Sequence, residues 1–390
     1  MPHKLLNRRD TLQAVPAENA PLGNWTGSAA NVESTLHQLS PYIGKTKSSM
    51  AASLVSQFTK AGDLVYDPFS GSSSVALEAW LAGRHVVAND ISPYAVVLTR
   101  AKLFPCRSLK KALSDIEALS AEVAELKGSI DLRTVPLWVR RFFHPETLRE
   151  TICWAQILKQ RRRWLLLASL LGILHHQRPG FLSFPSSHTV PYLRSKKFPR
   201  HRFPKLYEYR SVRDRLEAKV KRAFRRVPKL DFKLTRVCLS KDAGEVILAK
   251  RVAAIISSPP YMRLLDYGRD NRLRLWFLGV HDWHVLNKIV SPTESAFLNL
   301  MRRCFVRWRT TLKSGGYCVL IIGDECSRAG TGNLPQVVSR IATEEVGGYR
   351  RICEYTETIP DERRVRRGIV GSSSETILVL RKAPFGVRRQ

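Results

Sequence analysis

A glycine-containing loop is the first of two short motifs whose residue types could do chemistry. DPFSGSSS runs from Asp67 to Ser74, between a strand pattern and a helix pattern. Gly71 allows a sharp backbone turn where a side chain would block a ligand, and the helix behind it offers free N–H groups. Asp90 ends the next strand, where open α/β sheets place an acid for ribose hydroxyls. The acid at Asp67 suits a cationic ligand end and would repel a pyrophosphate, which fits the ammonium and sulfonium of S-adenosylmethionine.

The same loop has a plainer interpretation, an ordinary strand–turn–helix with a serine-rich cap. It lacks the G-x-x-x-x-G-K-[ST] pattern, which disfavours a nucleotide triphosphatase, and it is not a full G-x-G-x-x-G. The loop alone does not decide between these two interpretations.

The second motif is Ser257-Ser258-Pro259-Pro260-Tyr261, which follows the apolar strand pattern VAAII. Two prolines remove two N–H donors and stiffen the backbone, so the preceding carbonyls point outward as acceptors. The amino group of a nucleobase needs such acceptors, because hydrogen bonds to both its N–H groups favour the nucleophilic, tetrahedral form. Ser258 Oγ and the Pro259 carbonyl are the candidate acceptors, and Tyr261 offers a face on which an extruded base could stack. The alternative is a proline-stiffened strand exit with a packing tyrosine.

Alternating strand and helix patterns flank both motifs and predict an α/β fold with an open sheet. Strands are expected at 64–67, 85–90, 252–258, 317–324 and 375–382, and helices at 50–58, 75–81, 93–103, 297–312 and 334–343. Between them lie helical patterns at 109–126, 145–159, 164–175 and 211–224. We therefore expect a flexible N-terminal arm (1–35), the cofactor half of the catalytic domain (36–106), an inserted helical, basic module (107–235) and the catalytic half (236–390).

The inserted module is expected to read DNA. From Arg194 to Arg236 it holds 17 Lys and Arg residues against 4 Asp and Glu. Cations would meet phosphates there, and a few polar side chains could reach base edges; the loop FPSSHTVPY, at 184–192, is a candidate contact to the target strand. A basic solvated surface is the alternative. The candidate DNA-binding residues are His188, Arg194, Lys196, Lys197, Arg200, Arg202 and, after the second motif, Arg269.

Composition points to the same class of partner. The formal net charge is +31 over 390 residues, which is typical of proteins with polyanionic partners. Seven scattered cysteines without a C-x-x-C pair favour neither disulfides nor a metal site. The longest apolar run, Trp164 to Leu174, is too short for a bilayer, and the polar start predicts no signal peptide. We expect a cytoplasmic, nucleoid-associated protein with double-stranded DNA as partner and no membrane.

Taken together, the two motifs resemble those of the DNA amino-methyltransferases, the cytosine-N4/adenine-N6 group. DPFSGSSS is similar to the cofactor loop D-P-F-x-G-S-G-T of that group but has Ser73 and Ser74 where the group has glycine and threonine. SSPPY is similar to its catalytic T/S-P-P-Y. The resemblance covers roughly 36–105 and 236–382 and leaves the insert unplaced. It implies a Rossmann-like S-adenosylmethionine-dependent methyltransferase sheet, base flipping and direct transfer without a covalent enzyme intermediate.

The resemblance also implies which residues hold the cofactor. The segment before the loop contributes a lysine, the strand ends contribute acids, and the sequence CLSKDAGEV resembles the part that contacts adenine. The implied cofactor-binding residues are Lys45, Asp67, Pro68, Phe69, Gly71, Asp90, Ile91, Asp242, Ala243 and Ser257.

Ser258 favours cytosine N4 as the target, since members with S-P-P-Y typically act there and those with D-P-P-Y on adenine N6. Many S-P-P-Y members have the opposite motif order. Adenine N6, an RNA amino-methyltransferase and a non-catalytic DNA-binding protein on this fold stay open as alternatives. A restriction or defence partner and the oligomeric state stay open too.

Overall fold

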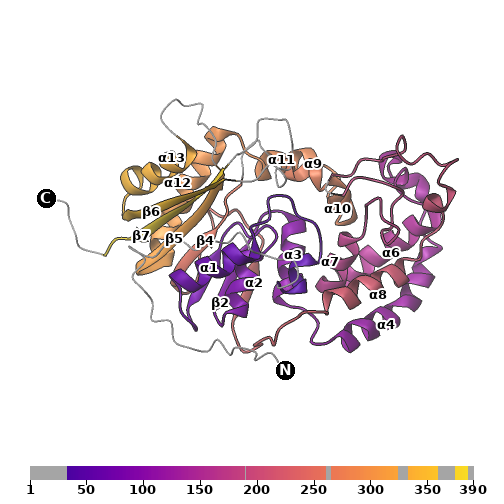
Figure 1. Cartoon of the computed structure of the whole chain (residues 1–390), viewed down its shortest axis with the longest axis horizontal. Helices are drawn as coiled ribbons and strands as arrows, with labels where there is room; N and C mark the ends of the chain where they lie inside the picture. Colours follow the sequence, from indigo (N-terminus) through magenta and orange to yellow (C-terminus); the bar gives the residue numbers. More distant parts are fainter. Residues whose placement is uncertain (1–32, 189, 261–264, 324–332, 359–373, 385–390) are drawn as a thin grey trace, which may run out of the picture.

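Seven strands form one mixed sheet in this computed structural model, which describes residues 33–188, 190–260, 265–323, 333–358 and 374–384 (Figure 1). Their order is β3-β2-β1-β4-β5-β7-β6. β1 to β5 pair in parallel, whereas β7 runs antiparallel to both neighbours. The bounds are β1 Leu64–Asp67, β2 His85–Asn89, β3 Arg236–Leu239, β4 Val252–Ser257, β5 Leu312–Gly323, β6 Tyr349–Thr358 and β7 Ser374–Lys382.

Apolar side chains of the strands pack into two hydrophobic cores, one on each face of the sheet. Val65 packs into one core and its neighbour Tyr66 into the other, as the period of two along a strand requires. Strand β4 continues this pattern with Ile256 and Ile255 on opposite faces. A sheet buried on both faces reads as nearly continuous apolar sequence, which is why these strands could be predicted.

Helices cover both faces of the sheet, so the part of the molecule that contains the sheet has three layers (Figure 1). Pro93 occupies the first turn of α3, where its missing N–H costs nothing. One face carries α1 Ser48–Phe58, α2 Ser74–Leu81 and α3 Pro93–Leu103, and the other α12 Glu294–Thr311 and α13 Leu334–Arg340, followed by a π-turn at Ile341–Glu345.

The insert forms a helical layer beside α3, at the right of Figure 1. The insert also packs closely against the segment before α1, since a Cβ on Gly172 would lie 2.1 Å from the Leu39 carbonyl oxygen. The insert contains α4 Leu109–Lys127, α5 Leu137–Arg140, α6 Pro145–Gln160, α7 Trp164–Gly172 and α8 Val212–Ala223, with short 3-10 turns at Leu132–Thr134 and Pro204–Tyr207.

After the insert the chain forms β3 and β4 of the sheet. Three short helices then follow. These are α9 Tyr267–Asp270, α10 Arg272–Phe277 and α11 Trp283–Val290. Within the described residues, no helix combines the length and the apolar character that crossing a membrane would require.

The predicted elements and the observed ones agree closely, and the predicted fold class is confirmed. Strands β3 and β6 and helices α5 and α11 were not predicted as elements. The expected flexible arm lies outside the described residues up to residue 32; Ser34 and Thr35 are buried, and Thr35 Oγ donates to the Ala223 carbonyl of α8. A 3-10 turn, Thr35–Gln38, follows. The predicted domain boundaries stay a prediction.

Candidate active site

A pocket opens at the carboxyl ends of β1, β2 and β4. The strand order runs outward from β1 in both directions, so this edge is the switch point at which open α/β sheets bind ligands. The space inside the pocket, counted together with the part open to solvent at its mouth, amounts to about 770 Å³. Among its lining residues are Pro68, Phe69, Gly71, Asp90, Ile91, Asp242, Ala243, Ser258 and Pro260, all of them predicted site residues.

Ser257 joins the two motifs, although they lie 190 residues apart in the sequence. Its hydroxyl donates to Asp67 Oδ1 over 2.6 Å and accepts the Phe69 N–H over 3.0 Å. Both side chains are buried, with Asp67 2% exposed. Strand pairing between β1 and β4 therefore places the proline motif directly against the glycine loop.

Gly71 turns the loop beneath a tyrosine ring. Its φ is +47°, and a Cβ there would lie 3.2 Å from the ring of Tyr42, so glycine favours this conformation, and a larger residue would force the ring to shift by a few tenths of an ångström. Asp90 fixes this turn, since its carboxylate accepts the Gly71 N–H over 2.7 Å and the Ser92 N–H over 2.9 Å.

Burial raises the pKa of both acids at this edge. It raises the pKa of Asp67 to about 7, against the opposing hydrogen bond from Ser257. It raises the pKa of Asp90 to about 6, against the N–H groups of Ser92 and Gly71. Within the described part of the chain neither acid forms an ion pair with a cationic side chain. Two buried acids without a cation suit a ligand that brings its own positive charge.

Asn89 connects the ends of β1 and β2 to the segment that carries Asp242. Its amide donates to the Pro68 carbonyl over 3.1 Å and to the Lys241 carbonyl over 3.0 Å, and it accepts the Lys241 N–H over 3.1 Å. Asp242 pairs with Arg303 of α12 over 2.8 Å. Asn89 was missed from the sequence, although a polar residue ending a buried strand is a usable signal.

Two tyrosines that the site prediction also missed complete the pocket wall. Tyr42 and Tyr267 both line it, with their ring centroids 6.0 Å apart. Tyr42 also stacks on Tyr94 at 5.8 Å. Tyr42 precedes the glycine loop, and Tyr267 lies in the segment after the proline motif that resembles the family. The sequence did not predict that their rings meet, because they lie far apart along the chain and come together only through tertiary packing.

The remaining predicted site residues lie as follows. The Lys45 ammonium donates to the His37 carbonyl over 3.1 Å, and its neighbours Gly44 and Thr46 line the pocket. Ser258 Oγ donates to the Ile321 carbonyl over 3.2 Å, and Pro259 is buried. Tyr261 lies outside the described residues.

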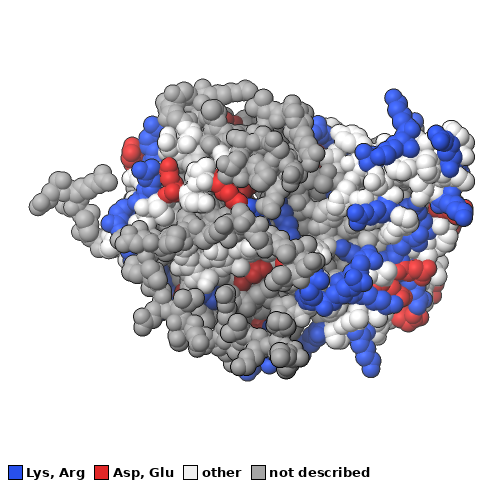
Figure 2. Space-filling view, viewed as in Figure 1, with Lys and Arg blue, Asp and Glu red and all other residues white. Residues whose placement is uncertain are grey.

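Most of the predicted DNA-binding residues lie on the exposed segment between α7 and α8 of the insert. Figure 2 shows several groups of Lys and Arg side chains on the part of the molecule that the insert forms, at the right of the view. His188 packs edge-on against His176 at 4.5 Å, and Arg194 bonds Gln177 over 2.5 Å. Arg269, on α9, pairs with Asp266 over 2.5 Å. Its carbonyl accepts a hydrogen bond from Arg272, which also donates to the Pro191 carbonyl of the insert. Lys196, Lys197, Arg200 and Arg202 are exposed.

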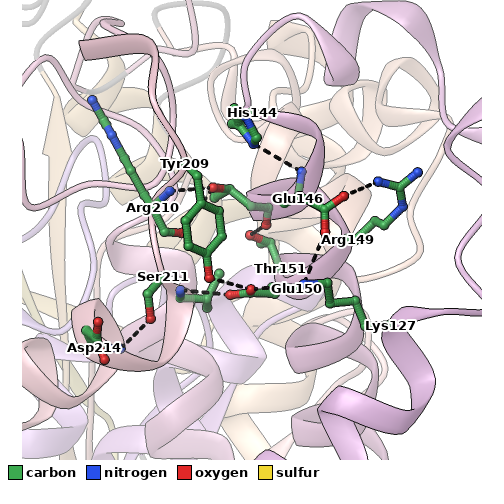
Figure 3. A network of polar contacts seen from close by, with 12 residues as sticks. Lys127, His144, Glu146, Arg149, Glu150, Thr151, Tyr209, Arg210, Ser211 and Asp214 are labelled. Atoms are coloured by element: carbon green, nitrogen blue, oxygen red, sulfur yellow. Dashed lines mark hydrogen bonds and ion pairs between the residues drawn. The ribbon is translucent and has the colours of Figure 1, made fainter. Parts of the chain in front are cut away.

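The end of this basic segment is attached to α6 by a network of polar contacts (Figure 3). Glu150 accepts the Tyr209 hydroxyl over 2.6 Å and the Val212 N–H over 3.1 Å. Thr147 Oγ donates to the Arg210 carbonyl over 3.0 Å and accepts the Arg210 N–H over 2.9 Å. The buried Arg210 guanidinium donates to three further carbonyls, those of Phe181, Ser183 and Leu206. These contacts fix the C-terminal end of the basic segment, next to the start of α8.

Comparison with known proteins connects the cofactor half to DNA methylation. Residues 42–130 match the family model of the D12 class N6 adenine-specific DNA methyltransferases. Over 95 residues, or 24% of its length, the chain is 29% identical to the Type II methyltransferase M.MjaII of Methanocaldococcus jannaschii. That match spans only 18% of the length of the curated relative. Both findings support the resemblance to DNA amino-methyltransferases without separating cytosine N4 from adenine N6.

Solved structures of methyltransferases also align with the chain. TrmN from Thermus thermophilus is 12% identical, with 87% of this chain and 50% of that chain covered and a TM-score of 0.35. An rRNA methylase from Streptococcus thermophilus is 7% identical, with 87% and 98% covered and a TM-score of 0.33. The predicted cofactor, S-adenosylmethionine, is confirmed by the family match of the loop-bearing segment, and the acid-lined pocket fits it.

Proposed function

We propose that this protein is a DNA methyltransferase that transfers the methyl group of S-adenosylmethionine to the exocyclic amino group of a base. The observation that carries the proposal is the Asp67–Ser257 hydrogen bond of 2.6 Å, which sets the acceptor-rich proline motif against the cofactor loop. When bound, S-adenosylmethionine supplies an electrophilic methyl group on a sulfonium.

The chemistry assigned to the protein is orientation of the amino group. The amino nitrogen is a poor nucleophile until acceptors engage its N–H groups. Ser258 and Pro260 line the pocket, and Pro259 between them has no N–H that could compete for acceptors. Ser258 Oγ and the Pro259 carbonyl are the proposed acceptors, with Tyr261 as the proposed stacking partner for the base.

No cysteine nucleophile is assigned to this reaction. Burial raises the pKa of the Cys106 thiol, so the thiolate needed for attack on a pyrimidine ring is disfavoured. Cys106 follows α3 and is not among the residues that line the pocket. Direct transfer is the mechanism that agrees with this arrangement.

DNA is the proposed substrate because of the insert and its connection to the pocket wall. Arg272 of α10 donates to the Pro191 carbonyl over 2.5 Å, and its guanidinium lies 5.0 Å from the ring of Tyr192. Tyr192 is 51% exposed. This contact connects the basic loop of the insert to the helices that follow the proline motif. A strand held on the insert would then run past Tyr192 toward the pocket, where exposed aromatic faces and cations suit bases and phosphates.

Two observations favour different target bases. Ser258, in place of aspartate, favours cytosine N4. The match of residues 42–130 to an adenine-specific class favours adenine N6 at least as strongly. Fold, cofactor and mechanism are the same for both, so the two candidates differ only in the product.

The test is methyl transfer from radiolabelled S-adenosylmethionine to duplex DNA, with RNA as competitor. We expect label in DNA that excess RNA does not suppress. Pro259→Ala should cut turnover more than it weakens cofactor binding, because it restores a donor next to the acceptor carbonyl, whereas Cys106→Ala should stay active. Label in RNA alone would replace the proposal with the RNA alternative, and cofactor binding without any transfer would favour the non-catalytic one.

A further inference from the structure

Ser73 is the strained residue of the cofactor loop. Its φ is 60° and its ψ is 40°, which places it in the left-handed region. This conformation is strained for a residue with a Cβ but not for glycine. Ser73 is 0% exposed, and its hydroxyl has no hydrogen-bond partner within the described residues. Neither capping nor solvation of the side chain offsets the strain.

The peptide on the N-terminal side of Ser73 is held by a buried lysine. Lys102, on α3, is 2% exposed, and its ammonium donates to the Ser72 carbonyl. That carbonyl belongs to the peptide unit whose nitrogen is the Ser73 N–H. Fixing its direction restricts the φ of Ser73, the torsion that is strained.

The lysine lies in a buried group of ionisable side chains. His37 bonds Glu78 of α2 over 2.6 Å, and Lys45 lies 3.9 Å from Glu33. Burial, and after it the charge of Lys45, lower the pKa of Lys102, whereas the two acids favour its charged form. Burying an ammonium group lowers the stability of the folded protein unless nearby groups compensate its charge. A lysine buried at this place therefore suggests that its ammonium has a function there.

The turn also sets the helix that follows. Ser73 is the N-cap residue of α2. The Ala76 N–H, in the first turn of α2, bonds the Asp67 carboxylate. A change in the peptide before Ser73 would therefore move a donor to Asp67 as well as the pocket-lining Ser72 and Gly71.

We propose that Lys102 is a positioning residue for the cofactor loop, whose ammonium, by holding the Ser72 carbonyl, stabilises the left-handed turn that this chain makes with serine instead of glycine. The inference rests on the proposed function only in taking this loop as the cofactor site. If the proposal is right, Lys102 is needed to hold the loop in this conformation only because residue 73 is serine and not glycine.

The experiment is a double-mutant cycle on the full chain, with Lys102→Met, Ser73→Gly and the combined variant. S-adenosylmethionine affinity is measured by calorimetry, which is independent of any transfer to DNA. Lys102→Met should weaken the affinity for S-adenosylmethionine about tenfold. This is the ratio of affinities that corresponds to the free energy of a left-handed residue with a Cβ. Ser73→Gly alone should keep or improve affinity. The combined variant should recover to within about threefold of the unaltered protein.

The controls separate positioning from general loss of structure. Lys60→Met makes the same change at an exposed lysine and should not alter affinity. DNA affinity and thermal midpoint are measured for every variant, and KM for the cofactor should rise in Lys102→Met while kcat at saturation changes little. Unaltered affinity in Lys102→Met would overturn the proposal. So would a combined variant that stays as impaired as Lys102→Met in affinity or in folding. If the unaltered protein binds cofactor but never methylates DNA, the proposed function fails and this cycle still decides the role of Lys102.

Discussion

Two acids at the ends of β1 and β2 carry the electrostatics of the pocket. With unfolded carboxyl groups titrating near pH 4, the native protein holds extra protons on Asp67 and Asp90 up to about pH 7 and 6. Without ligand, the contribution of these groups to the free energy of unfolding therefore falls as the pH rises through that window. A bound cationic ligand has the opposite effect on this pH dependence, because it stabilises the ionised carboxylates.

The first prediction concerns Asp67. Cofactor affinity should rise between pH 5.5 and 7.5 in calorimetric titrations, because ionisation of a carboxyl with a pKa of about 7 must precede its interaction with a cation. Asp67→Ala should weaken binding by on the order of 2–3 kcal/mol at pH 7.5 and flatten the pH dependence. Equal affinity at all pH values in the unaltered protein would remove Asp67 from the cofactor site.

The sequence could indicate individual residues near the pocket where a polar or proline-rich motif directly follows a strand pattern. Nine of the predicted site residues line the pocket, whereas Asp67 and Ser257 are buried and hydrogen-bonded to each other; the roles of these residues stay a prediction. Tyr42, Asn89 and Tyr267 were missed because their role arises from tertiary contacts. Ser73 was noted as a departure from the family pattern, but only the structure shows that it adopts the conformation for which glycine is suited.

At the scale of elements, the strands and helices that bury a full face could be predicted and those at edges could not. β3 is four half-buried residues, and β6 mixes charged and aromatic residues at the edge of the sheet, so neither shows a clear apolar period. The helices α9 to α11 are short, and α10 packs against α3 and α6 as well as against α9, so their positions depend on tertiary contacts.

The second prediction concerns the contact between α9 and α11. A Cβ on Gly268 would lie 2.7 Å from the Trp283 carbonyl oxygen and 2.8 Å from Asn287 Cβ. Gly268→Ala should separate the helices, move Tyr267 and lower stability by about 1–3 kcal/mol, with weaker cofactor binding. Thermal unfolding and calorimetry measure the two effects.

Gly128→Ala is the matched control for this change. No atom lies within 4 Å of a Cβ at Gly128, and its φ is −65°, so cofactor affinity should stay unchanged and stability should stay equal or rise slightly. If Gly268→Ala behaves like Gly128→Ala, the α9–α11 contact does not shape the pocket.

The third prediction concerns the basic segment of the insert. Neutralising Lys196, Lys197, Arg200 and Arg202 together should lower DNA affinity and reduce the log–log salt slope by roughly 0.9 for each phosphate that the protein no longer neutralises. These side chains are exposed and lie away from the pocket, so cofactor affinity should be spared. Binding of labelled duplex DNA across a salt series measures the slope, and an unaltered slope would place the DNA surface elsewhere.

On the scale of the whole molecule, the sheet supplies the pocket and the insert supplies the charge. The net charge is +31, and residues 107–235 hold 29 Lys and Arg against 11 Asp and Glu, so the insert carries +18 of it. The sequence could predict that such a module interrupts the sheet, because helical patterns replace the alternation of strands and helices from about residue 107, and the excess of basic residues is concentrated in the last part of that region, from Arg194 to Arg236. It could not predict that the loop before α8 reaches the catalytic half through Arg272 and Pro191.

The most direct test of the central claim is nucleoside mass spectrometry of DNA from cells that express the protein, compared with cells that express Pro259→Ala. The account predicts a methylated exocyclic amine, N4-methylcytosine or N6-methyladenine, that is reduced in the variant. N4-methylcytosine would support the interpretation of Ser258, and N6-methyladenine would support the adenine-specific family match. The appearance of 5-methylcytosine that is abolished by Cys106→Ala would contradict the account, because it would require the covalent mechanism that the structure argues against.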